Sequence, residues 1–491
     1  MNKLINVIIG IVFTVFLLFL FSKHLNSIFF PFANEYREGH TYSSTVMLLR
    51  GENPFSISSY PAFYNSYGIL FNIVVLPFAF IFGNSLILHR LISAFFIFAI
   101  LFVVFRNSFI KREFSVFNLI CFVLLYSGLI YGPGGSVRPD NLGVFLFICS
   151  IIIPVNNHFD KRSLVLSMLF GLLSFYTKPY YFIGWISISI YMFLFVSYKR
   201  ALLLNFLFAI FFLLIGFLVS KLFPMYFYEV IFSYTNDAKS NLIMYSVKQL
   251  KHFLYYILPF LPIFMSYLIM RGSLKSILKN PYFVISIIIF LFLIYPLGLN
   301  LGAFLTYHFQ LLLPILCLFL MTFQDEKFES LKSNQLVLLL AIGFFYLFST
   351  KYIGIGKSKD DIGTWSKMSS YIDTKQNVLV GPLLAPMIMD KNRELYENGV
   401  SSYVFLFKSK AITKSIFSLD EKILERKESF ITDINSKIKK KYFDAIISSP
   451  DIDRGIYPLI DKSKYSLVKT VYLTTPHDGV NYKLNVFEPI K

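Results

Sequence analysis

Charged residues are scarce in this chain of 491 residues, in which Asp, Glu, Lys and Arg together make up only 15%. A soluble globular domain carries about 25% charged and about 45–50% apolar residues. Here 56% of the residues are hydrophobic and 19% are aromatic. A soluble core has no room for that much apolar surface. The composition therefore excludes an ordinary soluble enzyme and predicts that lipid is the main solvent.

Cysteine is also scarce. Cys121, Cys149 and Cys317 all fall inside apolar stretches, so we interpret them as small core hydrophobes. Neither a disulfide framework nor a zinc-binding spacing is present.

The first apolar run, from Leu4 to Phe21, lacks a small-residue cleavage site after it. This favours an uncleaved membrane span over a signal peptide.

Acidic residues are fewer than basic ones, which gives a formal net charge of +18. Such a balance is known from nucleic-acid-binding proteins. Here, however, Lys and Arg recur in the short loops between apolar stretches, as the positive-inside rule predicts for membrane proteins. Part of the excess can meet anionic lipid head groups. We therefore expect membrane lipids, and no nucleic acid, as partners.

About eleven apolar stretches are predicted to cross the membrane as helices. They are residues 4–22, 86–105, 115–132, 140–155, 163–177, 180–197, 201–220, 252–270, 281–299, 303–322 and 335–350. With a cytoplasmic N-terminus, the Lys- and Arg-bearing loops fall inside. Residues 66–83 would reverse this pattern if they crossed. We therefore expect them to lie at the interface, or to dip in and back, within a first outer loop of residues 23–85.

The sequence changes character after about residue 350. Lys and Asp residues become more frequent there. Residues 378–380 and 444–448 resemble short buried strands, and residues 420–441 resemble an amphipathic helix. We expect a transmembrane domain of residues 1–350 followed by a small extracytoplasmic α/β domain of residues 351–491. The predicted fold class is thus an α-helical polytopic protein of the plasma (inner) membrane.

Ionisable residues gather at the predicted outer side, where they are candidates for function. Glu35 and Glu38 in the first outer loop would share one helical face, although an ordinary solvated loop is the alternative. Arg138 and Asp140 open the fourth span, where Asp140 has the alternative role of a helix cap that pairs with Arg138. The glycines before them lack the G-K-[ST] ending of a phosphate loop.

Two further candidates lie at other outer turns. Lys178 is either a side chain that snorkels to the interface or a compact charge for an anionic ligand. His308, beside Tyr307, is either an interface anchor or part of a site. Carboxylates can act as a general base and cations can bind phosphate. The set therefore suits a lipid-phosphate substrate at the bilayer surface.

Several segments occur in an order typical of one enzyme class. They are Glu38-Gly39-His40, Leu48 to Phe55, Tyr60-Pro61, His89 to Ser93, Arg138-Pro139-Asp140, Lys178 and Gly302 to Tyr307. Because these segments occur in this order and on the predicted outer side, the chain resembles the GT-C superfamily of glycosyltransferases, which use polyprenyl-phosphate sugars. It is most similar to the branch containing protein mannosyltransferases and the lipid A aminoarabinose transferase.

The resemblance implies transfer of a sugar, with inversion, from an undecaprenyl- or dolichyl-phosphate donor to a glycan, lipid or protein acceptor on the outer face. Glu38 would act as the base, with Glu35 as the alternative and Asp140 as the third acid. Arg138, Lys178 and His308 would bind the donor phosphate. No cofactor is required and no metal ligands are assigned. The alternative is a divalent cation between Glu38 and Asp140.

The sequence departs from the family pattern at two places. Asn34-Glu35 stands where family members often have "DE" or "DxD", and Pro179 follows Lys178 where a polar residue is usual. Three other classes of function predict different features. A transporter or flippase would show internal repeats and broken helices. A polysaccharide polymerase or ligase usually has its main loop late in the chain. A non-catalytic sensor would bind a ligand with its outer domain, and loss of activity in a folded Glu38 variant would argue against it.

Overall fold

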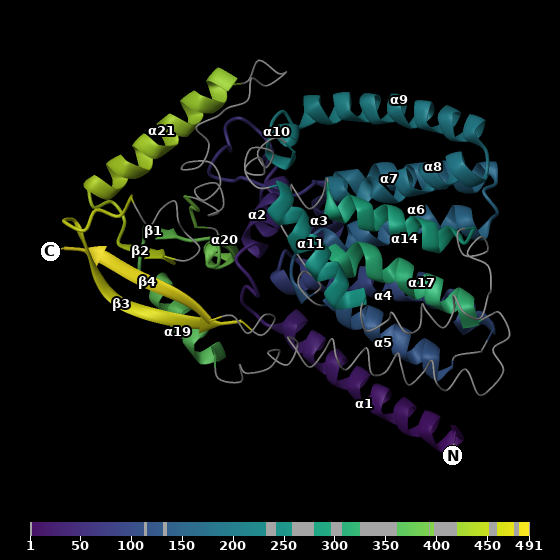
Figure 1. Cartoon of the computed structure of the whole chain (residues 1–491). Helices are drawn as coiled ribbons and strands as arrows, with labels where there is room; N and C mark the ends of the chain where they lie inside the picture. Colours follow the sequence, from purple (N-terminus) through teal and green to yellow (C-terminus); the bar gives the residue numbers. More distant parts are fainter. Residues whose placement is uncertain are drawn as a thin grey trace.

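The computed structural model describes residues 2–111, 115–130, 135–231, 242–257, 279–295, 307–324, 361–391, 393–396, 420–450, 459–475 and 481–490. It consists of a bundle of helices with a small sheet and its helices at one end of the bundle (Figure 1). A mostly helical protein with a small α/β part matches the predicted fold class. The predicted domain boundary at residue 350 lies outside the described residues.

Helices occupy the predicted spans wherever the structure describes them. They are α1 (Asn2–Phe29), α4 (Leu86–Lys111), α5 (Val116–Ile130), α6 (Asp140–Asn156), α7 (Lys161–Thr177), the 3₁₀ turn η2 (Pro179–Phe182) with α8 (Ile183–Phe195), α9 (Tyr198–Leu222), α14 (Pro281–Ile294), and the π-helical turn η5 (His308–Leu312) with α17 (Leu313–Gln324). The start of the predicted span 252–270 lies in helix α11 (Leu242–Ile257), and residues 258–270 fall outside the described residues. The predicted span 335–350 falls outside the described residues.

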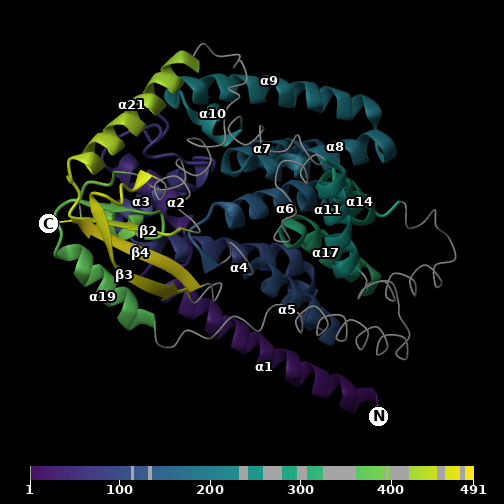
Figure 2. The same ribbon diagram turned by 60° about the vertical axis from the view of Figure 1, so that its left-hand side comes forward.

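Three helices in the described part of the chain are long and apolar enough to cross a membrane by themselves. They are α1 from Leu4, α4 up to Ile110, and all of α9. In α9 none of the most apolar window is buried, and α9 and α1 lie on opposite sides of the bundle (Figures 1 and 2). A long helix that is apolar and yet exposed is expected to face lipid. The count of about eleven crossings remains a prediction.

Hydrogen bonds hold loops in place at both ends of the bundle. At one end the Tyr191 hydroxyl of α8 donates to the Lys279 carbonyl (3.0 Å), which lies in one of the basic loops. At the other end the Gly68 amide donates to the Thr177 carbonyl (3.0 Å), and the Ser27 hydroxyl donates to the Gly135 carbonyl (2.9 Å). The predicted first outer loop therefore meets two other predicted outer turns, and the orientation of the bundle in the membrane stays a prediction.

The apolar segment predicted not to cross forms α3 (Leu70–Phe82), which follows α2 (Glu38–Leu49). With 13 residues it is about 20 Å long, shorter than the roughly 30 Å hydrocarbon core. Both of its ends are tied to α2. Asn72 donates to the Thr41 carbonyl (2.6 Å), and the Tyr42 hydroxyl donates to the Asn84 carbonyl (3.4 Å). Both ends of the segment therefore contact the same part of α2, and its position at the interface stays a prediction.

The C-terminal part is built on a four-stranded sheet with the order β1-β2-β4-β3. Strand β1 (Val378–Val380) is parallel to β2 (Ala445–Ser448), whereas β4 (Asn481–Pro489) is antiparallel to both β2 and β3 (Tyr465–Thr474). Helices α19 (Asp361–Asp373), α20 (Ala385–Asp390) and α21 (Asp420–Lys439) accompany it. The two predicted strands and the predicted amphipathic helix are confirmed. The β3–β4 hairpin was not predicted.

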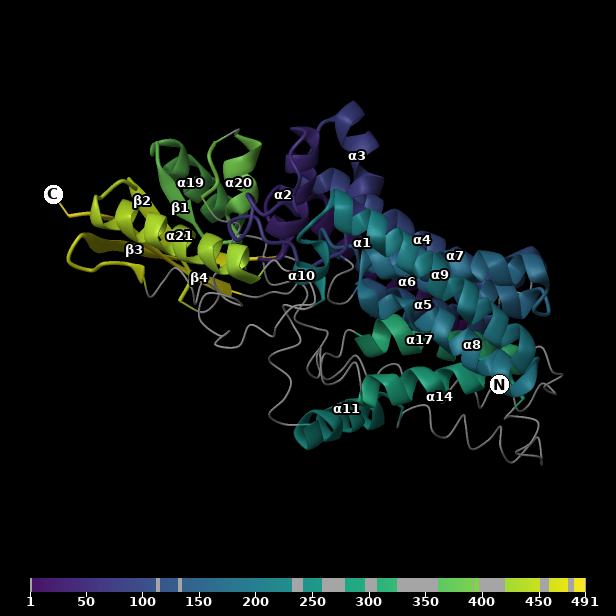
Figure 3. The ribbon, with the colours of Figure 1, turned by 90° about the horizontal axis from the view of Figure 1, so that it is seen from above.

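The C-terminal part packs on the end of the bundle that carries the first outer loop (Figure 3). Phe32 stacks on Trp365 of α19 with ring centroids 5.3 Å apart. Arg426 of α21 donates to the Ser58 carbonyl (2.8 Å). A Cβ atom on Gly39 would lie 2.7 Å from the Pro382 carbonyl oxygen, so α2 can approach the sheet this closely only with glycine there. One shared apolar core joins the two parts.

Candidate active site

Glu38, at the start of α2, is fully buried and fully hydrogen-bonded. Its Oε1 accepts from Arg90 Nε (2.9 Å) and from the Val137 amide (2.7 Å). Its Oε2 accepts from Arg90 Nη2 (2.7 Å) and from the Asn34 amide (2.7 Å). Both side chains of this ion pair have zero exposure. The pair joins α2 to α4 and holds the first outer loop beside the loop before α6.

Glu35 and Arg138 form a second buried ion pair, in which Nε and Nη2 of Arg138 donate to the two carboxylate oxygens. Burial alone would lower the pKa of Arg138, but the Glu35 carboxylate outweighs this effect and raises the pKa well above its usual range. Arg138 therefore remains a cation. This bidentate contact is the geometry in which a guanidinium recognises any planar oxyanion.

Asp140 and Lys178 form the third pair. The Asp140 Oδ1 atom accepts from Lys178 Nζ (2.8 Å) and from the Tyr181 hydroxyl (2.7 Å). The other oxygen, Oδ2, is buried and makes no hydrogen bond within the described part of the chain. Asp140 opens α6, and Lys178 separates α7 from η2. Asp140 is the first residue of α6 but does not cap it, because the N-cap residue is Pro139 and no side-chain hydrogen bond caps this helix. Its ion-pair partner is Lys178 and not Arg138, so both alternatives considered from the sequence were wrong.

Aromatic rings surround the Lys178 ammonium. Its Nζ atom lies 4.9 Å from the centre of the Tyr67 ring, 5.1 Å from that of Tyr307 and 5.8 Å from that of Tyr180. Burial raises the pKa of Tyr67 to about 12, although the neighbouring cations Arg138, Arg37 and Lys178 oppose that shift. Tyr67 thus keeps its proton and can donate a hydrogen bond. Lys178 is held in the protein and does not snorkel to the interface.

Arg37 is a member of the site that the sequence analysis overlooked. It is half-buried, donates to the Tyr36 hydroxyl (2.8 Å) and lies 4.9 Å above the Tyr36 ring. The charge of Arg138 acts on it directly. Its flanking glutamates had suggested a solvated, charge-balanced loop. The position of Arg37 two residues after Glu35 could have indicated that it belongs to the site. That indication depends on Arg138, which only the fold brings close to this loop.

His308 lies at the edge of this site. Its Nε2 atom is hydrogen-bonded to Gln249 Oε1 of α11 (2.8 Å), and it follows Tyr307, whose ring faces Lys178. Gln310, two residues further on, is hydrogen-bonded to the Tyr181 hydroxyl (2.9 Å). The segment beginning at Tyr307 is thus brought against the Asp140–Lys178 pair, although His308 itself bonds to α11.

The charges of the site do not cancel. Arg37, Arg138 and Lys178 supply three positive charges, and Glu35 and Asp140 supply two negative ones. The site therefore has one surplus positive charge next to several tyrosines. Cations arranged in a largely buried place attract an anion more strongly than they would in water. A phosphate group matches both the charge and the guanidinium geometry.

The residues do not fit the divalent cation considered from the sequence. Glu38 binds Arg90 and two amides, whereas Asp140 binds Lys178, so the two carboxylates are committed to different basic side chains. Within the described ranges no three His, Cys, Asp or Glu side chains are grouped as metal ligands.

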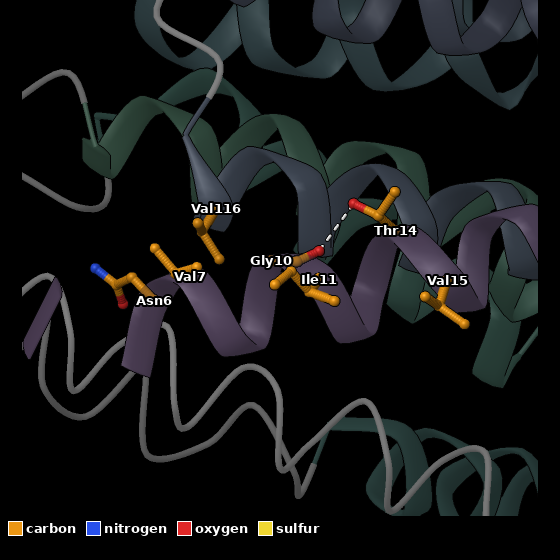
Figure 4. A pocket seen from close by; sticks show the side chains of 7 residues that line it. All are labelled: Asn6, Val7, Gly10, Ile11, Thr14, Val15 and Val116. Carbon is orange, nitrogen blue, oxygen red and sulfur yellow. Dashed lines mark hydrogen bonds between the residues drawn. The ribbon is translucent and has the colours of Figure 1, made fainter. Parts of the chain in front are cut away.

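A surface pocket elsewhere has a different character. It lies along α1 beside the start of α5 and is lined by Asn6, Val7, Gly10, Ile11, Thr14, Val15 and Val116 (Figure 4). No charged side chain is among these lining residues, and Thr14 donates to the Gly10 carbonyl of its own helix (2.8 Å). The pocket is not part of the ionic site.

The architecture is that of a polytopic membrane protein with an ionic site between its outer loops, a class known from solved structures. No family model and no curated protein matches the sequence. The crystal structure of ArnT from Cupriavidus metallidurans in the apo state is similar, with a TM-score of 0.57 and 11% identity over 98% of this chain and 97% of that one. The same protein bound to undecaprenyl phosphate gives a TM-score of 0.55 with 11% identity over 97% of each chain.

At this level of identity the likeness establishes the fold. ArnT is the lipid A aminoarabinose transferase, a GT-C glycosyltransferase. Almost the whole chain therefore has a fold similar to that of ArnT.

Proposed function

We propose that this protein is a membrane glycosyltransferase that moves a sugar from a polyprenyl-phosphate donor to an acceptor. The observation that carries the proposal is the surplus positive charge formed by the buried side chains of Arg138 and Lys178 and the half-buried Arg37. The neighbouring fold, ArnT, has been solved with undecaprenyl phosphate bound. A lipid phosphate at the membrane surface is the ligand that suits both facts.

In the proposed reaction the acceptor oxygen attacks the anomeric carbon of the sugar while the bond from that carbon to the phosphate oxygen breaks. The electron pair stays on the phosphate, whose charge changes from one negative to two. Arg138 and Lys178, with Arg37, stabilise that developing charge. His308, at the edge of the site, is a further ligand in this proposal. A single displacement of this kind inverts the anomeric centre.

The acceptor hydroxyl also needs a group to orient it and take its proton. The sequence favoured Glu38, with Glu35 second, but Glu38 already accepts four hydrogen bonds and Glu35 is engaged on both oxygens by Arg138. Asp140 has one oxygen, Oδ2, that accepts none in the described structure. We therefore assign the base to Asp140, with Glu38 and Glu35 holding the site together.

The orientation in the membrane follows from the same proposal. The ionic site and the C-terminal part lie at one end of the bundle, and this end faces away from the cytoplasm if the basic loops at the other end obey the positive-inside rule. Reporter fusions after Arg162, Arg200 and Lys279 are expected to give cytoplasmic signals. Fusions after Ser136 and Ile490 should report the outside. Cytoplasmic signals from the last two would contradict this orientation.

The decisive experiment is a transfer assay with the purified full-length protein and a panel of polyprenyl-phosphate sugars with glycan, lipid and protein acceptors. We expect transfer with at least one donor. Asp140→Asn should lower turnover by about 10²–10⁴-fold, the usual contribution of a general base, while Glu35→Gln acts mainly on donor binding. Asp160→Asn is the matched control, since Asp160 caps α7 at the opposite end and Asn caps equally well. Absence of transfer with every donor would refute the function.

A further inference from the structure

His40 is a buried histidine whose two ring nitrogens make no hydrogen bond within the described part of the chain. It lies in the first turn of α2 and is 1% exposed. Neither Nδ1 nor Nε2 has a hydrogen-bond partner among the residues that the structure describes. Buried polar side chains are nearly always hydrogen-bonded, and leaving one unpaired costs about 1–3 kcal/mol. Such a side chain indicates a place where a ligand binds.

The surroundings of His40 identify the charge of that ligand. The charged groups that act on the imidazole are Arg37 and Glu35 from the preceding loop and Arg138 from the loop before α6. Two of these three are cations of the proposed phosphate site. The imidazole also lies at the N-terminal end of the 12-residue helix α2, where the helix dipole favours an anion. The ligand expected beside His40 is therefore an anion.

Burial lowers the pKa of His40 to about 3, and the positive charges of Arg37 and Arg138 contribute to this shift against the opposing charge of Glu35. The free imidazole is therefore neutral at physiological pH. A phosphate with two negative charges placed among these groups offsets the two guanidinium charges. The imidazole then becomes easier to protonate.

We propose that His40 is a ligand of the polyprenyl phosphate, and that it takes up a proton as the leaving phosphate gains its second negative charge. This inference rests on the proposed function and adds to it a residue and a proton. The acceptor oxygen bonds to the sugar, the phosphate keeps the electron pair of the broken bond, and the acceptor proton goes to Asp140. His40 takes its own proton from the acid form of the buffer, whose conjugate base stays in solution, and then donates this proton in a hydrogen bond to the phosphate.

The sign of the pH dependence follows from the two states of His40. Its pKa is higher with the product phosphate bound than without it, so binding takes up protons and becomes tighter as the pH falls. The phosphate monoester itself titrates near a pKa of about 6. That titration is common to the wild type and to a variant at position 40. The difference between the two proteins therefore reports His40.

The test is calorimetric titration of undecaprenyl phosphate into the full-length protein at pH 7, in two buffers with different ionisation enthalpies. The wild type is expected to take up more protons on binding than His40→Gln, which has an amide donor but no titrating group. The variant should also bind about 10-fold more weakly, as expected for loss of one charge-assisted hydrogen bond. His89→Gln is the matched control. His89, in α4, is also buried, but it is hydrogen-bonded to Asn84 just before that helix.

Equal proton uptake and equal affinity in wild type and His40→Gln would overturn the assignment of His40, while leaving the proposed function intact. A wild type that does not bind undecaprenyl phosphate at all would instead overturn the proposed function. If His40→Gln does not fold, as judged by its elution and melting profiles, His40→Asn is measured in its place. The same difference in proton uptake is expected for that variant.

Discussion

Glu38 of α2 and Arg90 of α4, 52 residues apart in sequence, form a completely buried ion pair through two hydrogen bonds of 2.9 and 2.7 Å. Arg90 also donates to the carbonyls of Phe30 and Phe32. The pair fixes the turn from α1 into α2, which carries Glu35 and Arg37, together with the first turn of α2, which carries His40. Its role is thus to position the site, in contrast to the catalytic role that the sequence suggested for Glu38.

Replacement of Glu38 should therefore act on folding before it acts on turnover. Glu38→Gln leaves the Arg90 charge buried without its counter-ion, and breaking a buried pair in this way costs about 3–5 kcal/mol. We expect a lower melting temperature and poor recovery from the membrane. The double variant Glu38→Gln, Arg90→Gln should regain part of the loss, because no charge then remains buried. A single variant that melts like the wild type but has lost its turnover would restore Glu38 as the base.

The packing of α2 against the C-terminal part can be tested at Gly39. In Gly39→Ala the new Cβ atom would lie 2.7 Å from the Pro382 carbonyl oxygen, which belongs to the backbone and cannot rotate away. Overpacking of this kind costs about 1–3 kcal/mol. We expect faster proteolytic release of the C-terminal part. Gly363→Ala in α19 is the control, since nothing lies within 4 Å of its Cβ position. Equal protease resistance in both would show that the contact does not hold the parts together.

The cationic residues should be separable from the base by binding measurements. Arg138→Gln and Lys178→Met keep most of the side-chain volume and remove one positive charge each. Each should weaken binding of undecaprenyl phosphate by about 10- to 100-fold, since one charge-assisted contact is lost. Lys199→Ala, at an exposed position beyond the opposite end of the bundle, should leave affinity unchanged. Unaltered affinity in both site variants would remove these two residues from the phosphate site.

Glu229 in α10 (Tyr226–Val230) predicts a pH dependence of stability. Its side chain is buried and its Oε2 atom accepts from the Asn65 amide (2.9 Å). Burial raises the pKa of Glu229 well above its usual range, although that hydrogen bond opposes the shift. In the unfolded chain the carboxyl ionises near pH 4.3. Ionisation then favours the unfolded state, so this group lowers stability as the pH rises above that value.

Glu229→Gln keeps an acceptor for the Asn65 amide and removes the ionisation. The variant should melt at a higher temperature than the wild type at pH 7 to 8. The two curves should converge near pH 4, where the wild-type carboxyl is neutral in both states. Thermal melts across this pH range provide the measurement. A variant that is less stable than the wild type at pH 8 would mean that Glu229 is ionised and stabilising in the folded protein.

Local patterns in the sequence were enough to locate most helices and their ends. Apolar runs and basic loops depend on residues close together in the chain, so α6 and α9 could be predicted within a few residues, as could the start of α4. The buried runs at Val378–Val380 and Ala445–Ser448 were recognisable as strands for the same reason. Strand β3 was missed because most of its residues are exposed, which removes the alternation that marks a strand.

The pairing of the charges was decided by the tertiary structure. The sequence alone suggested that Arg138 pairs with Asp140, two residues away. The fold instead pairs Arg138 with Glu35 over 103 residues and Asp140 with Lys178 over 38. Residue type determined that a cluster of acids and bases lies at the outer end. The packing of α2, α6 and α7 decides which polar atoms have partners, because a buried charge takes whichever partner the packing brings within reach. Among the described residues it leaves Asp140 Oδ2 and both ring nitrogens of His40 without a hydrogen bond.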